Sequence, residues 1–256
     1  MWHGKGKSKR QMENEVLVGE IEKVFVKSRK LYGSPRVHAE LKALGYPYNE
    51  KRVARLMQGK FVAKTKKKFR VTTNSRHNLP VAPNLLRQNF VSEAANRVWT
   101  SDITYIWTRE GWLYLAIVLD VFSRKVVGWS MSQHLGSDLV LNALNNAIAH
   151  RQPRQKIVFH SDQGIQYACS DTRQLLSNNG FVQSMSRKGR CYDNAITETF
   201  FHSLKTEQVY FERYETRKEA RQDIFNYIEV FYNRERRHSS LGYLSPDNFE
   251  KQFVNA

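Results

Sequence analysis

Apolar residues recur at spacings of three and four along residues 13–31, which is the period of an amphipathic helix. A second helix is predicted over 35–44, with Ser34 as its cap, and a short basic helix over 50–58, capped by Asn49. A helix, a turn containing glycine and a short basic helix form a helix-turn-helix pattern. The same spacing fits a packing bundle with a solvated basic face, so the pattern alone leaves both interpretations open.

The pattern changes at Val98, where runs of β-branched, aromatic and aliphatic residues replace the helical period. Three such runs are separated only by turn residues, and later strands alternate with helical segments. This order predicts an α/β fold in which helices flank a mixed sheet. The predicted strands are 98–107, 112–121, 125–132, 156–160 and 181–185, and the predicted helices are 137–150, 171–179, 194–209 and 216–232.

Residues 61–94 show neither period and contain prolines. We therefore divide the chain into a helical module at 1–60, a basic linker at 61–94 and an α/β core with a C-terminal helical extension at 95–256. The linker fits either a solvated tether or a segment that contacts a phosphate backbone. Its central basic residues are Lys66, Lys67 and Lys68.

Composition narrows the class of partner. The 256 residues include 41 Lys and Arg against 24 Asp and Glu, a formal net charge of +17, and residues 1–70 alone hold 19 basic against 6 acidic residues. Such an excess indicates a nucleic-acid partner. No run approaches the ~18 apolar residues of a membrane span, no secretory signal follows the basic N-terminus, and two cysteines do not make a disulfide scaffold. We therefore expect a cytoplasmic protein without a membrane partner.

Three carboxylates lie at positions that would suit a catalytic or metal-binding site. Asp102 lies inside the first predicted strand, Asp162 follows the fourth, and Glu198 opens a helix. Each also has an ordinary explanation: a polar residue on a strand, a turn residue before glycine, and an acid that suits the helix dipole. On an ideal helix, however, Glu198 and Lys205 share a face away from the apolar stripe, about 10 Å apart along the axis.

Clustered carboxylates repel one another unless a cation lies between them. Hard divalent ions such as Mg²⁺ take oxygen ligands, and two such ions roughly 3.5–4 Å apart can promote displacement at phosphorus. A metal site built from these acids would explain why a basic protein that seeks nucleic acid retains them.

Asp162 and Glu198 are separated by 35 residues, and Lys205 follows the glutamate by seven. This arrangement resembles the D,D-35-E pattern of retroviral integrases and insertion-sequence transposases, whose catalytic core has a ribonuclease-H-like fold. The flanking sequences resemble the second reading frame of bacterial insertion-sequence transposases of the copy-out-paste-in type. They are WTSDITY around Asp102, HSDQGIQY around Asp162, SMSRKGRCYDNAITETFFHSLKTE around Glu198, YNRERRHSSLGYLSP at 232–246 and LYGSPRVHAELKALGY at 31–46.

The resemblance implies metal-dependent DNA cleavage and strand transfer at transposon ends. Asp102, Asp162 and Glu198 would together hold two Mg²⁺ or Mn²⁺ ions, and Lys205 would contact DNA near the scissile phosphate. It also implies a bacterial, nucleoid-associated protein that acts as a homo-oligomer on transposon-end and target DNA. In this group the active enzyme is usually a fusion with the upstream reading frame, so the product of that frame is a further expected partner.

Further basic residues are expected to contact DNA in the third helix and near the C-terminus, where a solvated tail is the alternative. They are Lys51, Arg52, Arg55, Arg234, Arg236 and Arg237. Other polar residues are expected to have local roles: Asp120 with Ser123 in a turn, Asp193 as a helix cap and Glu207 on a helix surface. His160 is expected to pack or to support a neighbouring ligand, and not to bind a metal itself.

Two other functions stay open from the sequence. The basic N-terminal module, without a segment that resembles the upstream frame, also fits a DNA-binding regulator of transposition that has no catalytic activity. A ribonuclease-H-like nuclease acting on RNA–DNA hybrids is the third reading, and the 35-residue interval favours DNA transposition over it.

Overall fold

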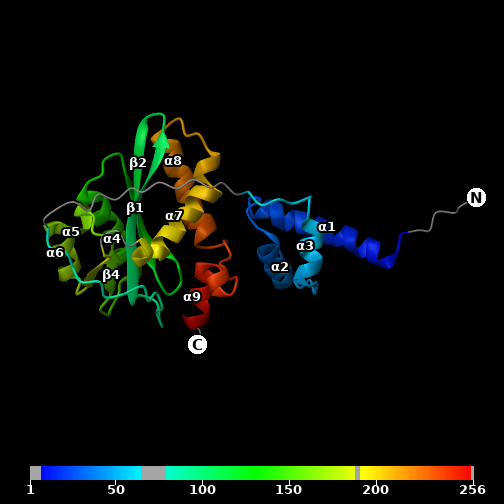
Figure 1. Ribbon diagram of the computed structural model, residues 1–256, viewed down its shortest axis with the longest axis horizontal. Coiled ribbons are helices and arrows are strands. Elements are labelled where there is room, and N and C mark those ends of the chain that lie inside the picture. The colour runs from blue at the N-terminus through cyan, green and yellow to red at the C-terminus, as the bar shows by residue number, and fades with distance from the viewer. Residues whose placement is uncertain (1–6, 65–78, 188–190, 255–256) are drawn as a thin grey trace, which may run out of the picture. The chain divides into compact units, whose positions relative to one another are not determined.

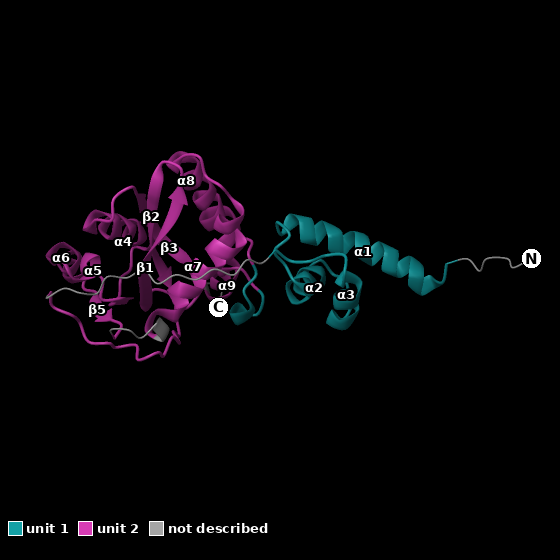
Figure 2. Ribbon diagram, turned by 45° about the horizontal axis from the view of Figure 1, so that its top comes forward, with its two compact units in different colours: residues 1–66, 237–243 teal, residues 67–236, 244–256 magenta. Residues whose placement is uncertain are grey.

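The computed structural model describes residues 7–64, 79–187 and 191–254. The chain forms two compact units (Figure 2). The first, the helical unit, comprises Met1–Lys66 with Arg237–Tyr243, and the second, the sheet unit, comprises Lys67–Arg236 with Leu244–Ala256. Of the expected linker, residues 61–64 lie in the helical unit and residues 79–94 lie in the sheet unit.

The helical unit contains three helices, α1 (Lys9–Lys27), α2 (Ser34–Ala43) and α3 (Glu50–Met57). α1 begins four residues earlier than the periodicity predicts, because Ser8 and Gln11 form a capping box that satisfies the first backbone N–H groups. Asn49 caps α3 as expected. The buried apolar residues of the three helices form the core of this unit; they include Leu17, Ile21, Val37, Leu41 and Val53.

Residues Arg237–Tyr243 complete the helical unit although Arg237 follows Lys66 by 171 positions. The backbone N–H of Arg237 donates to the Tyr32 hydroxyl at 2.8 Å, and its guanidinium forms an ion pair with Glu40. Leu241 of the same segment is buried. Two separate segments of the chain therefore form this unit, which no local sequence pattern indicates.

The sheet unit is built on five strands in the order β3-β2-β1-β4-β5. The strands are β1 (Val98–Thr108), β2 (Gly111–Asp120), β3 (Val126–Ser132), β4 (Val158–Ser161) and β5 (Val182–Met185). The first three pair antiparallel as successive hairpins, and β4 and β5 then add in parallel on the other side of β1. The predicted mixed sheet is confirmed.

Helices cover both faces of this sheet (Figure 1). α4 (Ser137–Arg151) packs on one face, where a side chain at Gly128 of β3 would lie 2.4 Å from the Ala143 carbonyl oxygen, so only glycine permits the close approach. α5 (Ile165–Ala168) and α6 (Ser170–Asn178) contact α4. The other face carries α7 (Ala195–Glu207) and α8 (Arg217–Phe225).

Two stretches differ from the expected elements. The single helix predicted over 216–232 ends as α8 at Phe225 and continues as a π-helical segment, Asn226–Tyr232. A further helix, α9 (Pro246–Val254), is not among the predicted elements, and it packs by Phe249 and Phe253 against Phe122. In the parts of the chain that the structure describes, no helix has the length and apolarity needed to cross a membrane.

Candidate functional site

Asp102 lies in the middle of β1, half-buried, and its Oδ1 accepts a hydrogen bond from the Ile103 N–H at 2.7 Å. Burial raises its pKa well above the ordinary value, and the negative charges of Asp162 and Glu198 raise it further. The Ile103 N–H and the Lys205 ammonium act in the opposite direction. A carboxyl pKa responds in this way to charges that lie nearby. The three acids singled out from the sequence are therefore neighbours in the fold.

Parallel pairing brings Asp162 beside Asp102. β1 and β4 are in register at Thr100 and His160, so the two aspartates each lie two residues beyond the same pair. Side chains two residues apart on a strand point to the same face. The Asp162 Oδ1 accepts from the Gly164 N–H at 2.9 Å, which orients its carboxylate at the end of β4.

Glu198 is held over the sheet by the start of α7. The Thr197 hydroxyl lies 2.8 Å from the Thr100 hydroxyl of β1 and 3.0 Å from the Asn194 amide oxygen, and all three residues are buried. The Asn194 amide also donates to the Ser101 carbonyl at 3.3 Å. Glu198 itself is exposed, and partial desolvation raises its pKa. Thr197 is not predictable from the sequence, because one threonine inside a helix gives no signal of such a contact.

The three acids suit a hard divalent ion by their chemistry. All three supply carboxylate oxygens, and the pKa of Asp102 is raised first by burial and then by the charge of Asp162, both of which a bound cation would offset. Among residues 7–64, 79–187 and 191–254, however, no group of three or more His, Cys, Asp or Glu side chains lies close enough to hold a metal ion. The charges of the three acids interact, but their side chains do not form a complete set of metal ligands in this structure.

Lys205 lies on the same side of α7 as this cluster. Its Nζ is 5.3 Å from the centre of the Tyr105 ring, a cation–π contact. Burial lowers the pKa of the ammonium and the Asp102 carboxylate partly restores it. The lysine expected to face DNA therefore stands between an aromatic ring and the acids.

Tyr167 is a buried neighbour of both aspartates that the sequence analysis did not single out. Its hydroxyl lies 2.9 Å from the Ser101 Oγ. Burial raises its pKa well above the ordinary value, and the charges of Asp102 and Asp162 add to this effect. A tyrosine in this position stays neutral and braces the strand that carries Asp102.

His160 and Asp193 fix the loops around the acids. The buried His160 ring is hydrogen-bonded to the Ser184 hydroxyl and to the Asp193 carbonyl, both at 2.8 Å, so its expected packing role is confirmed. Asp193 is not the helix cap that we expected. Its buried carboxylate accepts hydrogen bonds from Asn84, Gln88 and Arg187, because the folded chain brings these donors to it.

Asp120 has the local role expected of it. Its carboxylate accepts from the Asn96 N–H at 2.7 Å and from the Phe122 N–H at 2.9 Å, which closes the turn after β2. The Ser123 hydroxyl accepts from the Lys125 N–H of this turn at 3.3 Å and donates to Glu250 of α9 at 2.6 Å.

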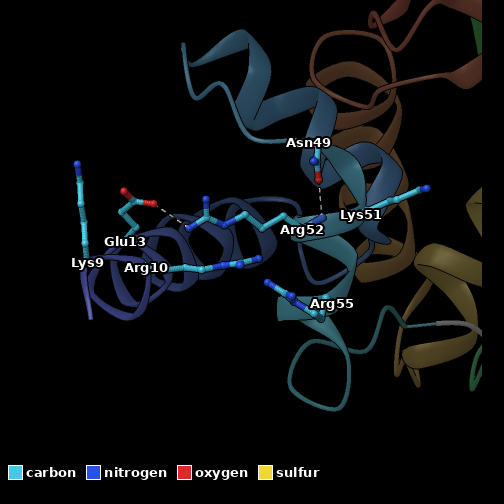
Figure 3. Close-up of a pocket in the computed structure, with 7 residues that line it drawn as sticks. All are labelled: Lys9, Arg10, Glu13, Asn49, Lys51, Arg52 and Arg55. Carbon is cyan, nitrogen blue, oxygen red and sulfur yellow. Dashed lines mark hydrogen bonds and ion pairs between the residues drawn. The ribbon is translucent and has the colours of Figure 1, made fainter. Parts of the chain in front are cut away.

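The helical unit contains a hollow of about 710 Å³ lined mainly by basic side chains from α1 and α3. Figure 3 shows Arg10, Arg52 and Arg55 gathered between the two helices. Of the expected contacts, Lys51 and Arg55 are exposed, whereas Arg52 is partly neutralised by Glu13 at 3.2 Å. The lining residues are Lys9, Arg10, Glu13, Asn49, Lys51, Arg52 and Arg55. Lys9 and Arg10 were not singled out beforehand, and Lys66, Lys67 and Lys68 lie outside the described residues.

The arginines near the C-terminus have different environments. Arg234 is exposed, as a DNA contact requires. Arg236 is only 4% exposed, and its Nη2 lies 2.5 Å from Glu207, so its guanidinium is enclosed in the protein. The expectation of DNA contact is therefore corrected for Arg236, and Glu207 is the partner of a buried ion pair instead of a surface residue. Arg237 is engaged by Glu40 and by the Tyr243 carbonyl.

Comparison with known proteins identifies the family. The integrase core domain model matches residues 92–191, a second integrase core domain model matches residues 198–254, and the HTH-like domain model matches residues 12–69. The transposase InsF of insertion sequence IS3A from Escherichia coli (strain K12) is 45% identical over 229 residues, which span 89% of this chain and 80% of that protein. The chain belongs to the family of insertion-sequence transposases. The family expected from the sequence is thereby confirmed.

Other similar proteins agree with this assignment. The insertion element IS600 uncharacterized 31 kDa protein from Shigella sonnei is 44% identical to this transposase over 247 residues, spanning 96% of this chain and 91% of that protein. A chain of the simian T-cell lymphotropic virus intasome, solved with the PP2A regulatory subunit B56 gamma, has a TM-score of 0.53 at 13% identity and covers 90% of this chain and 74% of that one. The latter likeness shows an integrase-like, ribonuclease-H-like fold.

Proposed function

We propose that Asp102, Asp162 and Glu198 form the catalytic centre at which this transposase cleaves transposon-end DNA and transfers the strand. The observation that carries this proposal is the placement of the three acids. Asp102 and Asp162 each lie two residues beyond the paired Thr100 and His160 of β1 and β4, and Thr197, next to Glu198, contacts Thr100. The Lys205 ammonium lowers the pKa of Asp102, but its effect is the weakest of those that act on this carboxyl group. Their arrangement supports a role in binding cations.

Two Mg²⁺ or Mn²⁺ ions are the cofactor we propose for these acids. When bound, such ions stabilise the attacking and leaving oxygens of an in-line displacement at phosphorus. The Ile103 and Gly164 N–H groups orient the two aspartates, and Thr197 holds the start of α7 so that Glu198 faces them. Because Glu198 is exposed, its side chain has room to approach the aspartates.

DNA contacts are proposed in both units. In the sheet unit, the Lys205 ammonium next to Asp102 would bind a phosphate oxygen close to the reacting bond, and Arg234 would bind the backbone further away. In the helical unit, Lys9, Arg10 and Arg55 line the basic hollow and would contact phosphates there. The linker lysines remain expected DNA contacts. A second copy of the chain and the upstream-frame product remain expected partners in assembly on the DNA.

The test of the catalytic centre is a nicking assay on transposon-end DNA with Mg²⁺. We expect Asp102→Asn, Asp162→Asn and Glu198→Gln each to abolish nicking while DNA binding, measured by fluorescence anisotropy, stays near the wild-type level. Asp171→Asn, the same change at an exposed acid of α6, is the matched control and should nick normally. Nicking at the wild-type rate by any of the three variants would remove that residue from the proposed centre.

A second readout separates metal binding from catalysis. Because an ion that binds only the folded state stabilises it, Mg²⁺ should raise the Tm of the wild-type chain and of Asp171→Asn but not of Asp102→Asn. Tight DNA binding without nicking, by the wild-type chain and by its fusion to the upstream frame alike, would instead favour the regulator function.

A further inference from the structure

Part of the linker is bonded to the residue that leads into α7. The Asn84 Nδ2 donates to the Asp193 Oδ2 at 2.8 Å, and the Gln88 Nε2 donates to the Asp193 Oδ1 at 2.9 Å. We call residues 84–88 the linker turn. The Asp193 side chain is completely buried, although these two partners precede it by 109 and 105 positions in the chain. The linker turn therefore contributes to the surroundings of α7.

The backbone of the linker turn is held in an unfavourable conformation. Arg87 and Gln88 have φ angles of 47° and 67°, in the left-handed region that residues other than glycine rarely adopt. Two such residues in succession persist only where surrounding contacts hold them. The Asn84 Oδ1 accepts from the Arg87 N–H at 2.9 Å, and the bond from Gln88 to Asp193 holds the other end. The shape of the turn thus depends on its contact with Asp193.

A second series of hydrogen bonds joins the linker turn to Asp193 through the sheet. The Leu85 N–H donates to the Ser184 Oγ of β5 at 2.9 Å, and this oxygen lies 2.8 Å from the His160 Nδ1. The His160 Nε2 lies 2.8 Å from the Asp193 carbonyl oxygen. A carbonyl can only accept, so Nε2 carries the proton and Nδ1 accepts from the Ser184 hydroxyl. Both connections from the linker turn therefore end at the same residue.

Asp193 is connected to Glu198 through the start of α7. The next residue, Asn194, donates to the Ser101 carbonyl of β1 at 3.3 Å, and its amide oxygen lies 3.0 Å from the Thr197 hydroxyl. Thr197 immediately precedes Glu198 on this helix. A displacement of Asp193 would therefore move the first turn of α7 together with the carboxylate that it carries.

The bonds from Arg187 to Asp193 have a different effect from those of the linker turn. Arg187 precedes Asp193 by only six positions, so this pair fixes the shape of a short loop. The Arg187 side chain is also 57% exposed, and exposed ion pairs contribute little to stability. Asn84 and Gln88 lie outside this loop, and their bonds hold it in place on the sheet.

We propose that Asn84 and Gln88 are positioning residues for Glu198. By holding Asp193, they fix the start of α7 so that the Glu198 carboxylate faces the two aspartates. The linker is then part of the catalytic unit, and release of the linker turn lowers the rate of cleavage although every acid is retained. This inference rests on the proposed function, because it takes the catalytic role of Glu198 from there.

The experiment reverses the direction of one hydrogen bond. Gln88→Glu places a second carboxylate against Asp193, whereas in Gln88→Glu/Asp193→Asn an amide at position 193 can donate to a carboxylate at position 88. Single-turnover nicking of transposon-end DNA with Mg²⁺ is measured at saturating DNA, and the Kd for this DNA by fluorescence anisotropy. We expect Gln88→Glu to lower the nicking rate roughly tenfold with little change in Kd, and the double variant to recover most of the rate.

Gln174→Glu is the matched control, because it makes the same change at an exposed glutamine of α6. It should nick at the wild-type rate. A loss that the double variant does not restore would overturn the proposal, because the hydrogen bond would then not be its cause. A weaker Kd with an unchanged rate at saturating DNA would also overturn it, since the linker turn would then be a DNA contact.

Hydrogen exchange by mass spectrometry gives a readout that does not depend on cleavage. Gln88→Glu should speed exchange in residues 195–201 of α7, and the double variant should restore it, while β1–β3 stay protected in both. Unchanged exchange at the start of α7 would overturn the proposal. If Gln88→Glu failed to fold, Gln88→Ala, which removes the donor without adding charge, would be used for the same measurements.

Failure of the catalytic assignment gives a different result. If Glu198→Gln nicked DNA at the wild-type rate while Gln88→Glu still sped exchange in α7, the proposed function of Glu198 would fail. The contact between the linker turn and α7 would stand in that case, without a role in catalysis.

Discussion

At the residue scale, the same type of side chain takes opposite roles according to what surrounds it. Burial and neighbouring acids raise the pKa of Asp102, whereas the Arg187 guanidinium, the Arg187 N–H and Gln88 hold the pKa of Asp193 far below its ordinary value. The first environment destabilises a carboxylate and favours a cation; the second stabilises the carboxylate and fixes a loop.

Asp193 gives a prediction about pH. Because its folded pKa is lowered, its contribution to stability is fully present above its unfolded pKa, near 3.8, and is lost as the pH falls through the lower folded value. Asp193→Asn should therefore lower the free energy of unfolding by roughly 2 kcal/mol at pH 7, with the difference from the wild type shrinking below about pH 4. Urea unfolding at pH 7, 4 and 3 measures this, and a difference that does not depend on pH would contradict the assigned role.

At the element scale, a buried ion pair joins the end of α7 to the segment after the π-helical turn. Arg236 and Glu207 are both nearly inaccessible, and the Tyr227 hydroxyl also donates to Glu207 at 2.8 Å. This pair fixes the C-terminal half of α7, the helix that carries Glu198 and Lys205. Its effect on the catalytic centre is therefore indirect, through the position of the helix.

Removal of one partner should be more harmful than removal of both. A buried charge left alone costs about 3–5 kcal/mol, whereas replacement of the whole pair by apolar side chains is often close to neutral. We expect Arg236→Met to lower the free energy of urea unfolding by about that amount, and Arg236→Met/Glu207→Met to recover part of the loss. Arg234→Met, at an exposed neighbour, is the control and should have little effect. Equal losses in the single and double variants would show that the pair is not the source.

At the scale of the whole molecule, the helical unit depends on a segment encoded after the sheet unit. Arg237–Tyr243 supplies the ion pair with Glu40, the hydrogen bond to Tyr32 and the buried Leu241. Much of this segment corresponds to the RRHSSLGY part of a motif that the sequence analysis treated as a tail or a DNA contact. Its described contacts instead support a structural role.

Leu241 tests this dependence. Leu241→Ala should destabilise the helical unit by about 2–5 kcal/mol, because the deletion leaves a cavity in a small core. Hydrogen exchange by mass spectrometry should show faster exchange in α1–α3 and unchanged exchange in the central strands of the sheet unit. Ser240→Ala, at the exposed neighbour, should change neither. Loss of protection in the sheet unit alone would contradict the assignment of the segment to the helical unit.

The sequence by itself determined the order of the elements and the identity of the three acids. Periodicity is a local property, so it predicted the three N-terminal helices, all five strands and most of the later helices within a few residues. The 35-residue interval between Asp162 and Glu198 is equally visible in one dimension. The sequence pattern did not predict α9, because its apolar residues pack against Phe122, which is far away in the chain.

Only the tertiary structure decided which polar groups meet. Charge alone could not distinguish Arg236, which is enclosed with Glu207, from the exposed Arg234. It could not place Lys205 over Tyr105, or leave the Trp107 and Trp112 side chains exposed. The physical reason is that burial, ion pairing and pKa depend on distances in space, and residues such as Thr100 and Thr197 approach only when the sheet and helix pack. The sequence specified the chemical groups, and packing determined which of them face one another and which remain open to a substrate.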